Sequence, residues 1–350
     1  MTTPAVSVIM AAYNGAALVG ETIASLQAQT LGDFEIVVVD DRSTDDTLAI
    51  LRGIDDPRLR VIESPINQGP VRARNRAMAE ARGRYIAGLD QDDLCRPERL
   101  AKQVAYLEAH PDTVLLGTAA AALEDGRVSA TGHAPASTPL LIEWLLRIEN
   151  PLVWSSVMVR ADTVRQLSPF TRPAMLYAED FDLYHRLAKL GRIARLDEEL
   201  LVYRRHGGGA SQCFIDTMRA NAALVLAEAH ATLFGDDAHE VARLMVQHIM
   251  GQEPVPHRVA LLQLGTALAR LQEDFLAHRL VDAESLTLIR WETARRWSRV
   301  GRAALRTGTI GLGDAMAVRP DHLGLGHAGV EELIMSRLIG GARSAIRRAK

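Results

Sequence analysis

Four short apolar runs alternate with helix-like patterns over the first 90 residues, and this alternation constrains the fold more than any other feature. The runs are Val6 to Met10, Phe34 to Val39, Leu59 to Ile62 and Tyr85 to Leu89. Short apolar runs of this kind are typical of buried strands, and the segments between them have the apolar spacing of helices. Strands that alternate with helices form a mostly parallel sheet covered by helices. The sequence therefore predicts an α/β fold.

Polar residues directly follow three of the four predicted strands. They are Tyr13 and Asn14 after the first strand, Asp40 and Asp41 after the second, and Asp90, Gln91, Asp92 and Asp93 after the fourth. In open α/β sheets, ligands bind beyond the carboxyl ends of the strands. The convergence of these residues at one edge of the sheet predicts a binding site there.

The acidic run after the fourth strand has two interpretations. Asp90 and Asp92 can face the same way, because strand side chains alternate with period two. Carboxylates crowd the end of a buried strand only when positive charge neutralises them, and a hard cation such as Mg²⁺ or Mn²⁺ is the usual solution. The alternative is an acidic loop that caps a helix opened by Pro97 and Glu98. The residues of this segment alone leave both interpretations open.

Beyond Asp93 the pattern changes, and after about residue 212 it becomes mostly helical. We expect helices over 97–110 and 140–147, and a further helix that begins with residues 178–183. We expect strands over 156–160 and 200–204. Asp125-Gly126 between two apolar runs predicts a hairpin of strands 114–123 and 127–130. We therefore expect a catalytic or binding domain over 1–212 and a mainly helical region of unknown role over 213–350.

The composition limits the compartment and the partners. Of 350 residues, 48% are hydrophobic and 24% are charged, and the net charge of -3 gives no signal for binding nucleic acid. Only two cysteines are present, which predicts no disulfide framework and a reducing, cytoplasmic environment. We expect no signal peptide, because no basic segment precedes the first apolar run. No apolar run approaches the ~18 residues that a membrane-spanning helix needs.

Two basic stretches lie near the C-terminus. The segment from Arg290 to Arg306 holds six arginines and one acid, Glu292. A helix over 329–350 places Arg343, Arg347 and Lys350 on one face. A basic amphipathic helix can lie on an anionic membrane, so peripheral contact with the inner face of the membrane is one expectation. The alternative is a solvated helix face packed on the rest of the protein.

Five sequence blocks, in this order, resemble the family-2 glycosyltransferases. They are VSVIMAAYN, VVVDDRSTDDT, ARNRAMAEARGRYIAGLDQDD, AEDFDLYHRLAKLG and YRRHGGGAS, and they cover roughly residues 4–212. The resemblance implies a GT-A catalytic domain with a Rossmann-like sheet, and a nucleotide-sugar donor, expected to be a UDP-sugar. It also implies a hydroxyl acceptor, which is a glycan, a lipid-linked molecule or another alcohol, and transfer with inversion at the anomeric carbon.

The resemblance also implies which residues hold the nucleotide. Tyr13 stacks on the base with Asn14 beside it, and Asp41 accepts a hydrogen bond from the uracil ring or a ribose hydroxyl. The alternatives are a half-buried tyrosine at the sheet edge and an aspartate that favours the next helix N-terminus. Ala11 departs from the Thr or Pro that family members often carry at this position. Arg74, in an Ala-Arg-Asn motif, lies where its fork geometry suits a diphosphate.

The resemblance identifies Asp90 to Asp93 as the metal motif for Mn²⁺ or Mg²⁺. Asp92 holds the cation directly and Asp93 supports it, while Asp90 meets the ribose, or the metal through water. His206 contacts the metal or the diphosphate, although a lone histidine is more often structural. The cation acts as a Lewis acid on the departing diphosphate.

The last implied role is that of the base. Glu179 and Asp180 match the family's Glu-Asp pair, in which Asp180 deprotonates the acceptor hydroxyl; capping of a helix N-terminus is the alternative. Trp154 either stacks on a sugar or lies in the core. Two other functions are a nucleotidyltransferase and a non-catalytic nucleotide-sugar-binding protein. Residues 11–15 lack the lysine or arginine that the first of these usually has, and the intact carboxylates argue against the second.

Overall fold

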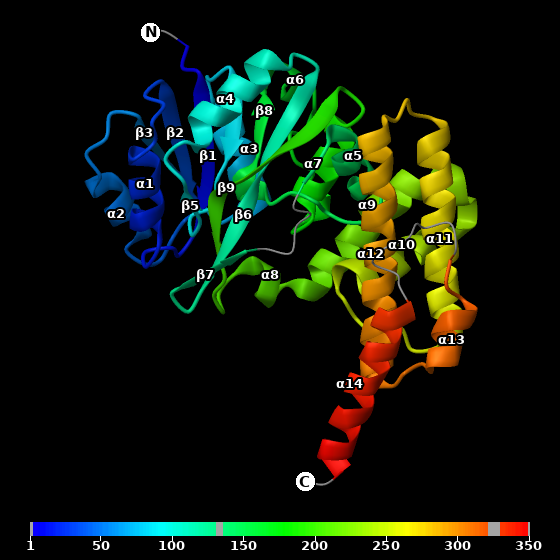
Figure 1. Ribbon diagram of the computed structural model, residues 1–350. Helices are drawn as coiled ribbons and strands as arrows, with labels where there is room; N and C mark the ends of the chain where they lie inside the picture. The colour runs from blue at the N-terminus through cyan, green and yellow to red at the C-terminus, as the bar shows by residue number, and fades with distance from the viewer. Residues whose placement is uncertain (1–2, 131–135, 321–329, 349–350) are drawn as a thin grey trace. The chain divides into compact units, whose positions relative to one another are not determined.

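The computed structural model describes residues 3–130, 136–320 and 330–348, which form two compact units (Figure 1). The first unit comprises Met1–Pro139 and Pro151–Asn221, and the second comprises Leu140–Asn150 and Ala222–Lys350. A division into domains at residue 212 stays a prediction.

The first part of the α/β unit has the predicted alternation of strands and helices. Its elements are β1 (Val6–Ala12), α1 (Val19–Gln27), β2 (Phe34–Asp40), α2 (Thr47–Gly53), β3 (Leu59–Glu63), α3 (Pro70–Glu80) and β4 (Tyr85–Gly88). Helix α3 begins where the sequence favours it, because Gly69 adopts a positive φ of 85° and Pro70 occupies the first turn.

The rest of this unit adds further strands and short helices. They are β5 (Leu94–Cys95), α4 (Arg99–Ala109), β6 (Thr113–Glu124), β7 (Arg127–Ala130), β8 (Met158–Arg160), α6 (Ala161–Val164), α7 (Glu179–Leu187), β9 (Arg192–Arg204) and α8 (Ala210–Cys213). Single 3₁₀ turns occupy Trp154–Ser156 and Pro173–Met175. The hairpin is confirmed: β6 pairs antiparallel with β7 across Asp125 and Gly126, both at positive φ.

The nine strands of the described ranges belong to one sheet, with the order β3-β2-β1-β4-β8-β6-β9-β5 and with β7 paired to β6. The first four strands are parallel, as predicted, and β6 and β9 are also parallel. The sheet as a whole is mixed, because β8 runs antiparallel to both β4 and β6, and β5 runs antiparallel to β9. The α/β fold is thus confirmed.

The register brings the functional loops to one edge. Ala12 at the end of β1 pairs with Asp40 at the end of β2, and Ile9 of β1 pairs with Gly88 at the end of β4. β1 and β2 therefore finish together, and β4 finishes at the same edge, three residues before the end of β1. Their following loops, which carry the polar residues singled out above, leave from the same side of the sheet.

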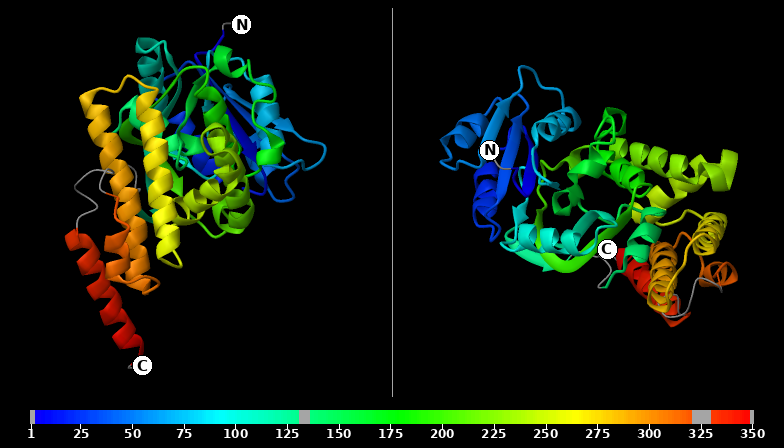
Figure 2. Two further views of the ribbon diagram at one scale, coloured as in Figure 1. Left: turned by 90° about the vertical axis from the view of Figure 1, so that its right-hand side faces the viewer. Right: turned by 90° about the horizontal axis from the view of Figure 1, so that it is seen from above.

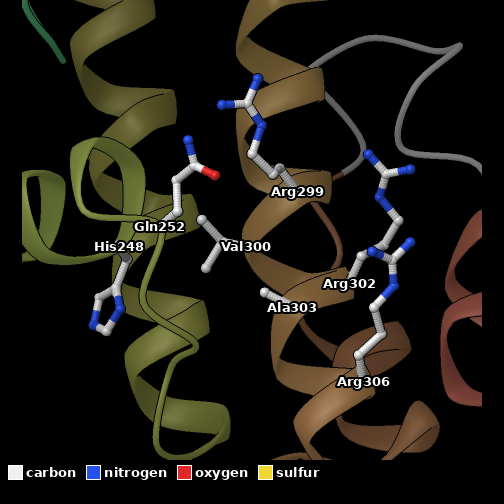
Figure 3. A pocket seen from close by; sticks show the side chains of 7 residues that line it. All are labelled: His248, Gln252, Arg299, Val300, Arg302, Ala303 and Arg306. Atoms are coloured by element: carbon white, nitrogen blue, oxygen red, sulfur yellow. The ribbon is translucent and has the colours of Figure 1, made fainter. Parts of the chain in front are cut away.

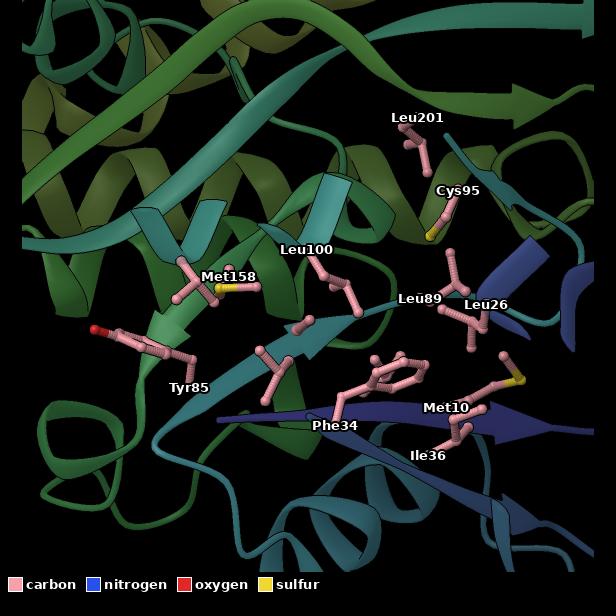
Figure 4. Close-up of a cluster of buried hydrophobic side chains, with 14 of the residues drawn as sticks. Met10, Leu26, Phe34, Ile36, Tyr85, Leu89, Cys95, Leu100, Met158 and Leu201 are labelled. Carbon is pink, nitrogen blue, oxygen red and sulfur yellow. The ribbon is translucent and has the colours of Figure 1, made fainter. Parts of the chain in front are cut away.

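The core of the unit lies between this sheet and its covering helices. Alternate residues of β1 and β2, including Met10, Phe34 and Ile36, pack with Leu26 of α1 and Leu100 of α4 (Figure 4). Each of these side chains is at most 4% exposed. Truncation of a buried leucine in such a core costs ~2 to 5 kcal/mol, so the packing fixes the strand ends firmly.

The second unit is helical, as predicted for the C-terminal region. It contains α5 (Pro139–Leu146), most of α9 (Ile215–Phe234), α10 (Ala238–Leu244), α11 (Arg258–Ala277), α12 (Ala283–Thr307), α13 (Leu312–Ala317) and α14 (Val330–Arg348). A π-helix, Met245–Met250, continues from α10. Helices α11 and α12 run side by side (Figure 2). Asp282 caps α12 by accepting a hydrogen bond from the Ser285 backbone at 2.8 Å.

Two further expectations concern the second unit. Over the described ranges, no helix has the length and apolarity required to cross a bilayer. The expected basic face of Arg343, Arg347 and Lys350 lies outside the side chains that the structure describes.

Candidate functional site

The acidic run after β4 is held in place by backbone and hydroxyl contacts. The Asp90 backbone donates a hydrogen bond to the Ser155 hydroxyl at 3.0 Å. The side chain of Asp90 is 37% exposed, whereas Asp93 as a residue is only 1% exposed. The two ends of the run therefore differ in solvent access.

Asp92 meets His206 although 114 residues separate them along the chain. The Nε2 atom of His206 lies 2.7 Å from Oδ2 of Asp92, and both side chains are partly exposed. His206 lies two residues beyond the end of β9, so this long strand brings it to the acidic run. The structure therefore brings together two of the residues predicted to hold a metal.

Asp93 is buried beneath this pair. The Arg204 backbone donates to its Oδ1 at 2.9 Å, while Oδ2 is buried without a hydrogen-bond partner among the described residues. Burial, followed by the charges of Asp90 and Asp92, raises the pKa of Asp93 well above its usual range. Arg204 also donates from Nε to the Asp92 carbonyl at 2.9 Å. Arg204 thus fixes the backbone of the acidic run.

Arg74 of α3 is buried between two carboxylates. Its guanidinium donates to Glu179 at 2.5 Å and to Asp90 at 3.0 Å, and the residue is 6% exposed. Although burial opposes its charge, Asp90 and then Glu179 raise the pKa of Arg74. Because these carboxylates occupy the guanidinium, the geometry gives Arg74 the role of positioning them. Its contact with a diphosphate stays a prediction.

Glu179 and Asp180 open α7 at the same place. Glu179 is 5% exposed and bound to Arg74, whereas Asp180 is half-buried and occupies the next position of the first turn. Ala178 precedes the helix and makes no side-chain cap, and Oδ1 of Asp180 accepts from the Phe181 backbone at 2.7 Å. This contact is compatible with the capping alternative, and it leaves the role of base as a prediction.

The segment before α7 is tied to α3 by the third residue of the Ala-Arg-Asn motif. The Asn75 side chain donates to the Thr171 carbonyl at 2.8 Å and accepts from the Thr171 backbone at 2.9 Å. Helix α3 therefore holds both Glu179, through Arg74, and the chain that leads to it. This explains in physical terms why arginine and asparagine occur together in the motif.

Trp154 supports Arg74 from below. The Arg74 guanidinium carbon lies 4.6 Å from the centre of the Trp154 ring, and Trp154 is 7% exposed. A Cβ atom added to Gly88 would lie 2.6 Å from this ring, so the glycine makes room for it. Of the two sequence interpretations, the geometry favours a buried tryptophan, and the cation–π contact adds to the charge-charge attraction that holds Arg74.

Tyr13 and Asn14 line the end of β1. The Tyr13 ring is available to a ligand, since the residue is 45% exposed. The Gln91 side chain exchanges two hydrogen bonds with the Tyr13 backbone, at 2.9 and 3.0 Å. Asn14 has a positive φ of 47° and accepts from the Thr44 backbone at 2.8 Å. Gln91 therefore links the β1 loop to the acidic run, and Asn14 links it to the β2 loop.

Asp40 and Asp41 both bind backbone amides. Asp40 accepts from the Ser43 backbone at 3.1 Å in the loop before α2. Asp41 is 2% exposed and accepts from Gly69 at 2.7 Å and from Gln68 at 3.0 Å, in the turn before α3. These contacts give Asp41 a structural role at the start of a helix. The helix is α3, and not α2, which follows Asp41 directly in the chain. Its contact with a base or ribose stays a prediction.

The net charge of this cluster is negative. Arg74 is enclosed with Asp90 and Glu179, while Asp92, Asp93 and Asp180 are nearby and Arg204 is engaged in part by Glu21. Desolvation, together with Asp92 and Glu179, raises the pKa of Asp90 despite the opposing effect of Arg74. A bound cation would relieve this repulsion. The predicted metal therefore fits the residues that are present.

Carboxylate oxygens are the donors that Mg²⁺ and Mn²⁺ prefer, and the buried, unpartnered Oδ2 of Asp93 is compatible with such a site. Within the described ranges, however, no group of three or more His, Cys, Asp or Glu side chains is arranged to hold a metal ion by itself. The remaining ligands would have to come from a diphosphate or from water.

Sequence reasoning assigned no role to three residues of the site. Gln91 lies inside the acidic run, Arg204 lies inside the block that contains His206, and Ser155 follows Trp154. Each acts through a contact with a distant backbone segment. Gln91 and Arg204 lie inside quoted blocks and Ser155 lies in none of them, and a side chain that binds backbone leaves no pattern of residue types.

Comparisons with known proteins identify the family of the chain. Residues 7–162 match the sequence profile of glycosyl transferase family 2. The chain is also 30% identical over 221 residues to an uncharacterized glycosyltransferase of Haemophilus influenzae, a match that covers 60% of this chain and 68% of that protein. The chain therefore belongs to glycosyl transferase family 2.

Two solved structures resemble the whole chain. Residues 1–349 of Staphylococcus aureus TarS, in complex with UDP-GlcNAc, superpose with a TM-score of 0.55 at 20% identity, covering 97% of this chain and 92% of that one. The mannosyltransferase PcManGT of Pyrobaculum calidifontis, in complex with GDP-Man and Mn²⁺, gives a TM-score of 0.51 at 19% identity, with coverage of 97% and 88%. At such identities the likeness is evidence for the fold alone, and these neighbours have the GT-A fold.

Proposed function

We propose that this glycosyltransferase moves a sugar from a nucleotide-sugar, with a UDP-sugar as the first candidate, to a hydroxyl acceptor with inversion and with the help of Mn²⁺ or Mg²⁺. The observation that carries the proposal is the Asp92–His206 pair at the end of β4, next to the first turn of α7 with Glu179 and Asp180. Supporting it, TarS was solved with UDP-GlcNAc and PcManGT with GDP-Man and Mn²⁺.

The nucleotide belongs at the ends of β1 and β2. The exposed Tyr13 ring offers a face for a base, and Asn14 and Gln91 hold the loop that carries it. Asp41 is already bound to two backbone amides, so it shapes the turn before α3 even where it does not touch the donor.

The diphosphate belongs beside the acidic run. Asp92 would hold the cation with Asp93 beneath it, and His206 would meet the cation or the diphosphate. Asp90 faces the ribose or a metal-bound water. A bound cation supplies Lewis-acid stabilisation of the leaving diphosphate. Arg204 and Ser155 keep these residues in register by holding their backbone.

The acceptor hydroxyl belongs beside α7. A sugar hydroxyl is a poor nucleophile at neutral pH, so a base must take its proton as it attacks the anomeric carbon. Asp180 is the candidate, since it is more exposed than Glu179, which Arg74 retains. Attack from the face opposite the leaving diphosphate in a single displacement inverts the anomeric centre.

The location and acceptor are parts of the same proposal. A cytoplasmic enzyme with peripheral contact to the inner face of the membrane would reach glycan or lipid-linked acceptors. Two free cysteines, Cys95 and Cys213, support a reducing compartment. Nothing in the site favours nucleic acid as a partner.

A donor screen tests the proposed function. Thermal stabilisation and donor turnover would be measured for a panel of UDP- and GDP-sugars, with Mn²⁺, with Mg²⁺ and in excess EDTA. We expect stabilisation by one donor class that depends on the metal, and its loss in Asp92→Asn. Asp236→Asn, which removes the same charge at an exposed position of the helical unit, should behave as the unmodified chain. Full turnover in EDTA would contradict the metal assignment.

The screen also separates the alternatives. A non-catalytic binding protein would be stabilised by a donor but would not consume that donor, whichever acceptor is added. A nucleotidyltransferase would release pyrophosphate from a nucleoside triphosphate. The family membership and the absence of lysine or arginine in residues 11–15 both weigh against that activity.

A further inference from the structure

The helical unit contains a pocket of about 390 Å³ that the proposed transfer reaction does not use. Three arginines of α12, Arg299, Arg302 and Arg306, line it together with His248 of the π-helix and Gln252 (Figure 3). All of these residues belong to the second unit. The pocket has the size of a small-molecule site.

The three arginines share one face of α12, because their spacing of three and four residues matches the helical repeat. In Figure 3 the side chains of Arg302 and Arg306 leave the helix in the same direction, while Arg299 extends toward Gln252. Like charges on one helical face repel each other unless an anion lies among them. The arrangement therefore favours a negatively charged ligand.

Neighbouring acids neutralise this face only in part, since Glu332 pairs with Arg302 alone of the three arginines. Arg295 and Arg296 of the same helix pair with Glu292, and Arg296 also pairs with Glu149. In contrast, neither Arg299 nor Arg306 has an ion pair within the ranges that the structure describes. The basic stretch noted in the sequence thus divides into arginines that stabilise the fold and arginines that line the pocket.

Arg302 is only partly satisfied. Its guanidinium lies 3.2 Å from Glu332 of α14, but its Nε atom is buried and has no hydrogen-bond partner among the described residues. A buried donor without a partner is costly. Burial, followed by the charge of Arg295, also lowers the pKa of Arg299. Both features indicate a cationic wall that is less stable without a ligand.

His248 and Gln252 are the polar residues that line the pocket beside the three arginines. His248 donates from Nδ1 to the Glu253 carbonyl when that nitrogen carries the proton, with the two atoms 2.9 Å apart. The residue is 2% exposed and lies on a π-helix, a distortion that is frequent at functional sites. Gln252 has a positive φ of 53°, an uncommon conformation for a residue other than glycine.

We propose that this pocket is a second anion site, which binds a phosphate or diphosphate group through Arg299, Arg302 and Arg306. Guanidinium forks bind such groups through paired hydrogen bonds. The volume exceeds what one phosphate fills, so a diphosphate, or a phosphate attached to a larger molecule, suits it best. The proposal does not rest on the transfer reaction, because none of these residues belongs to the α/β unit.

Calorimetry with inorganic pyrophosphate tests the site on the full chain, in EDTA and without added metal. Removal of the metal suppresses cation-bridged binding at the acidic run after β4. We expect saturable binding by the unmodified protein and a loss of about tenfold or more in affinity in Arg299→Gln and in Arg306→Gln. Neither substitution breaks an ion pair described above, so both variants should keep their circular dichroism and melting temperature.

Arg290→Gln is the matched control, since it removes the same charge from the exposed surface of α12, away from the pocket. It should bind pyrophosphate as the unmodified chain does. Absence of saturable binding by the unmodified chain would overturn the proposal. An equal loss in Arg290→Gln would also overturn it, because that result means general attraction to a basic helix.

A competition experiment then distinguishes the sources of the anion. Vesicles of phosphatidylcholine with phosphatidic acid, and separately UDP, would compete with pyrophosphate. If the vesicles compete with pyrophosphate and Arg299→Gln abolishes this competition, the result would support the site and assign it to a lipid headgroup. Competition by UDP alone would support it as a site for a soluble phosphate. If Arg299→Gln leaves every competition unchanged, the pocket is not the site.

Discussion

Arg74 is the residue on which the geometry of the site depends most. It lies between Asp90 and Glu179 and over the ring of Trp154, and it joins α3 to both β4 and α7. Breaking a buried ion pair by removing one partner is more costly than never having formed it, because the remaining charge stays buried.

We therefore expect Arg74→Met to lower the free energy of unfolding by about 3 kcal/mol and to abolish transfer. Urea denaturation followed by circular dichroism measures the first effect. Arg72→Met, which removes an exposed arginine two positions away on the same helix, should change stability by less than about 0.5 kcal/mol. If Arg74→Met changes the free energy of unfolding by a similarly small amount, Asp90 and Glu179 do not need the charge of Arg74.

Asp56 gives a pH-dependent prediction outside the site. Hydrogen bonds from the Arg58 side chain, at 3.0 and 2.8 Å, lower the pKa of Asp56 from 3.8 to about 2, against an opposing effect of burial. A carboxyl with a lowered pKa in the folded state adds stability above its unfolded pKa and loses it as the pH falls through the folded value.

At pH 7 we expect Asp56→Asn to be less stable than the unmodified chain by about 1 to 2 kcal/mol. The difference should shrink as the pH falls from 4 toward 2, the window between the two pKa values. Urea titrations at several pH values measure it. The neighbouring exposed Asp55→Asn serves as the control. A difference that stays constant down to pH 2 would refute the linkage.

At the scale of elements, α14 has an unusual surface. Ile334, Met335 and Leu338 are 40%, 56% and 61% exposed, whereas Leu333 is fully buried in the helical unit. One side of α14 thus packs within the helical unit and another presents apolar side chains to solvent. Such a helix supports the proposal of peripheral membrane contact, which the sequence raised from its basic residues.

The test of this proposal is sedimentation with phosphatidylglycerol vesicles at low salt. Met335→Gln combined with Leu338→Gln should reduce the bound fraction several-fold, because each buried CH₂ contributes about 0.8 kcal/mol to insertion. Leu280→Gln, at a fully exposed leucine before α12, should leave it unchanged. If the unmodified protein does not sediment with the vesicles, the proposal of peripheral membrane contact is wrong.

The elements also differ in how far sequence predicts them. β1 to β4 and the β6–β7 hairpin follow from local patterns, because apolar runs and an Asp-Gly turn carry their own signal. The mixed sheet does not, since β8 and β5 are short and their direction depends on pairing with distant strands. The family resemblance implied that Asp92 holds the metal and that His206 meets the metal or the diphosphate, but the direct contact between the two residues was not predicted. The partners of Asp41 and Arg74 depend on side-chain packing that spacing cannot give.

At the scale of the whole molecule, the chain joins an α/β unit, which contains most of the family-2 match, to a helical unit with its own arginine-lined pocket. The first unit has the fold and the acidic site from which we infer nucleotide-sugar transfer. The second unit has the surfaces from which we infer anion and membrane binding. The three inferences depend on different residues, so each can fail without the others.

The most direct test of the account is the behaviour of Asp180→Asn. Asparagine keeps the shape and the capping ability of aspartate but cannot accept a proton. The assay contains Mn²⁺, an acceptor and a donor that the unmodified chain consumes. Under these conditions, transfer by Asp180→Asn should fall by ~10²- to 10⁴-fold, while donor affinity stays near that of the unmodified chain. Asp216→Asn, at an exposed position in the first turn of α9, is the matched control. Near-normal transfer by Asp180→Asn would contradict the assignment of Asp180 as the base, and lost donor binding would place Asp180 with the nucleotide.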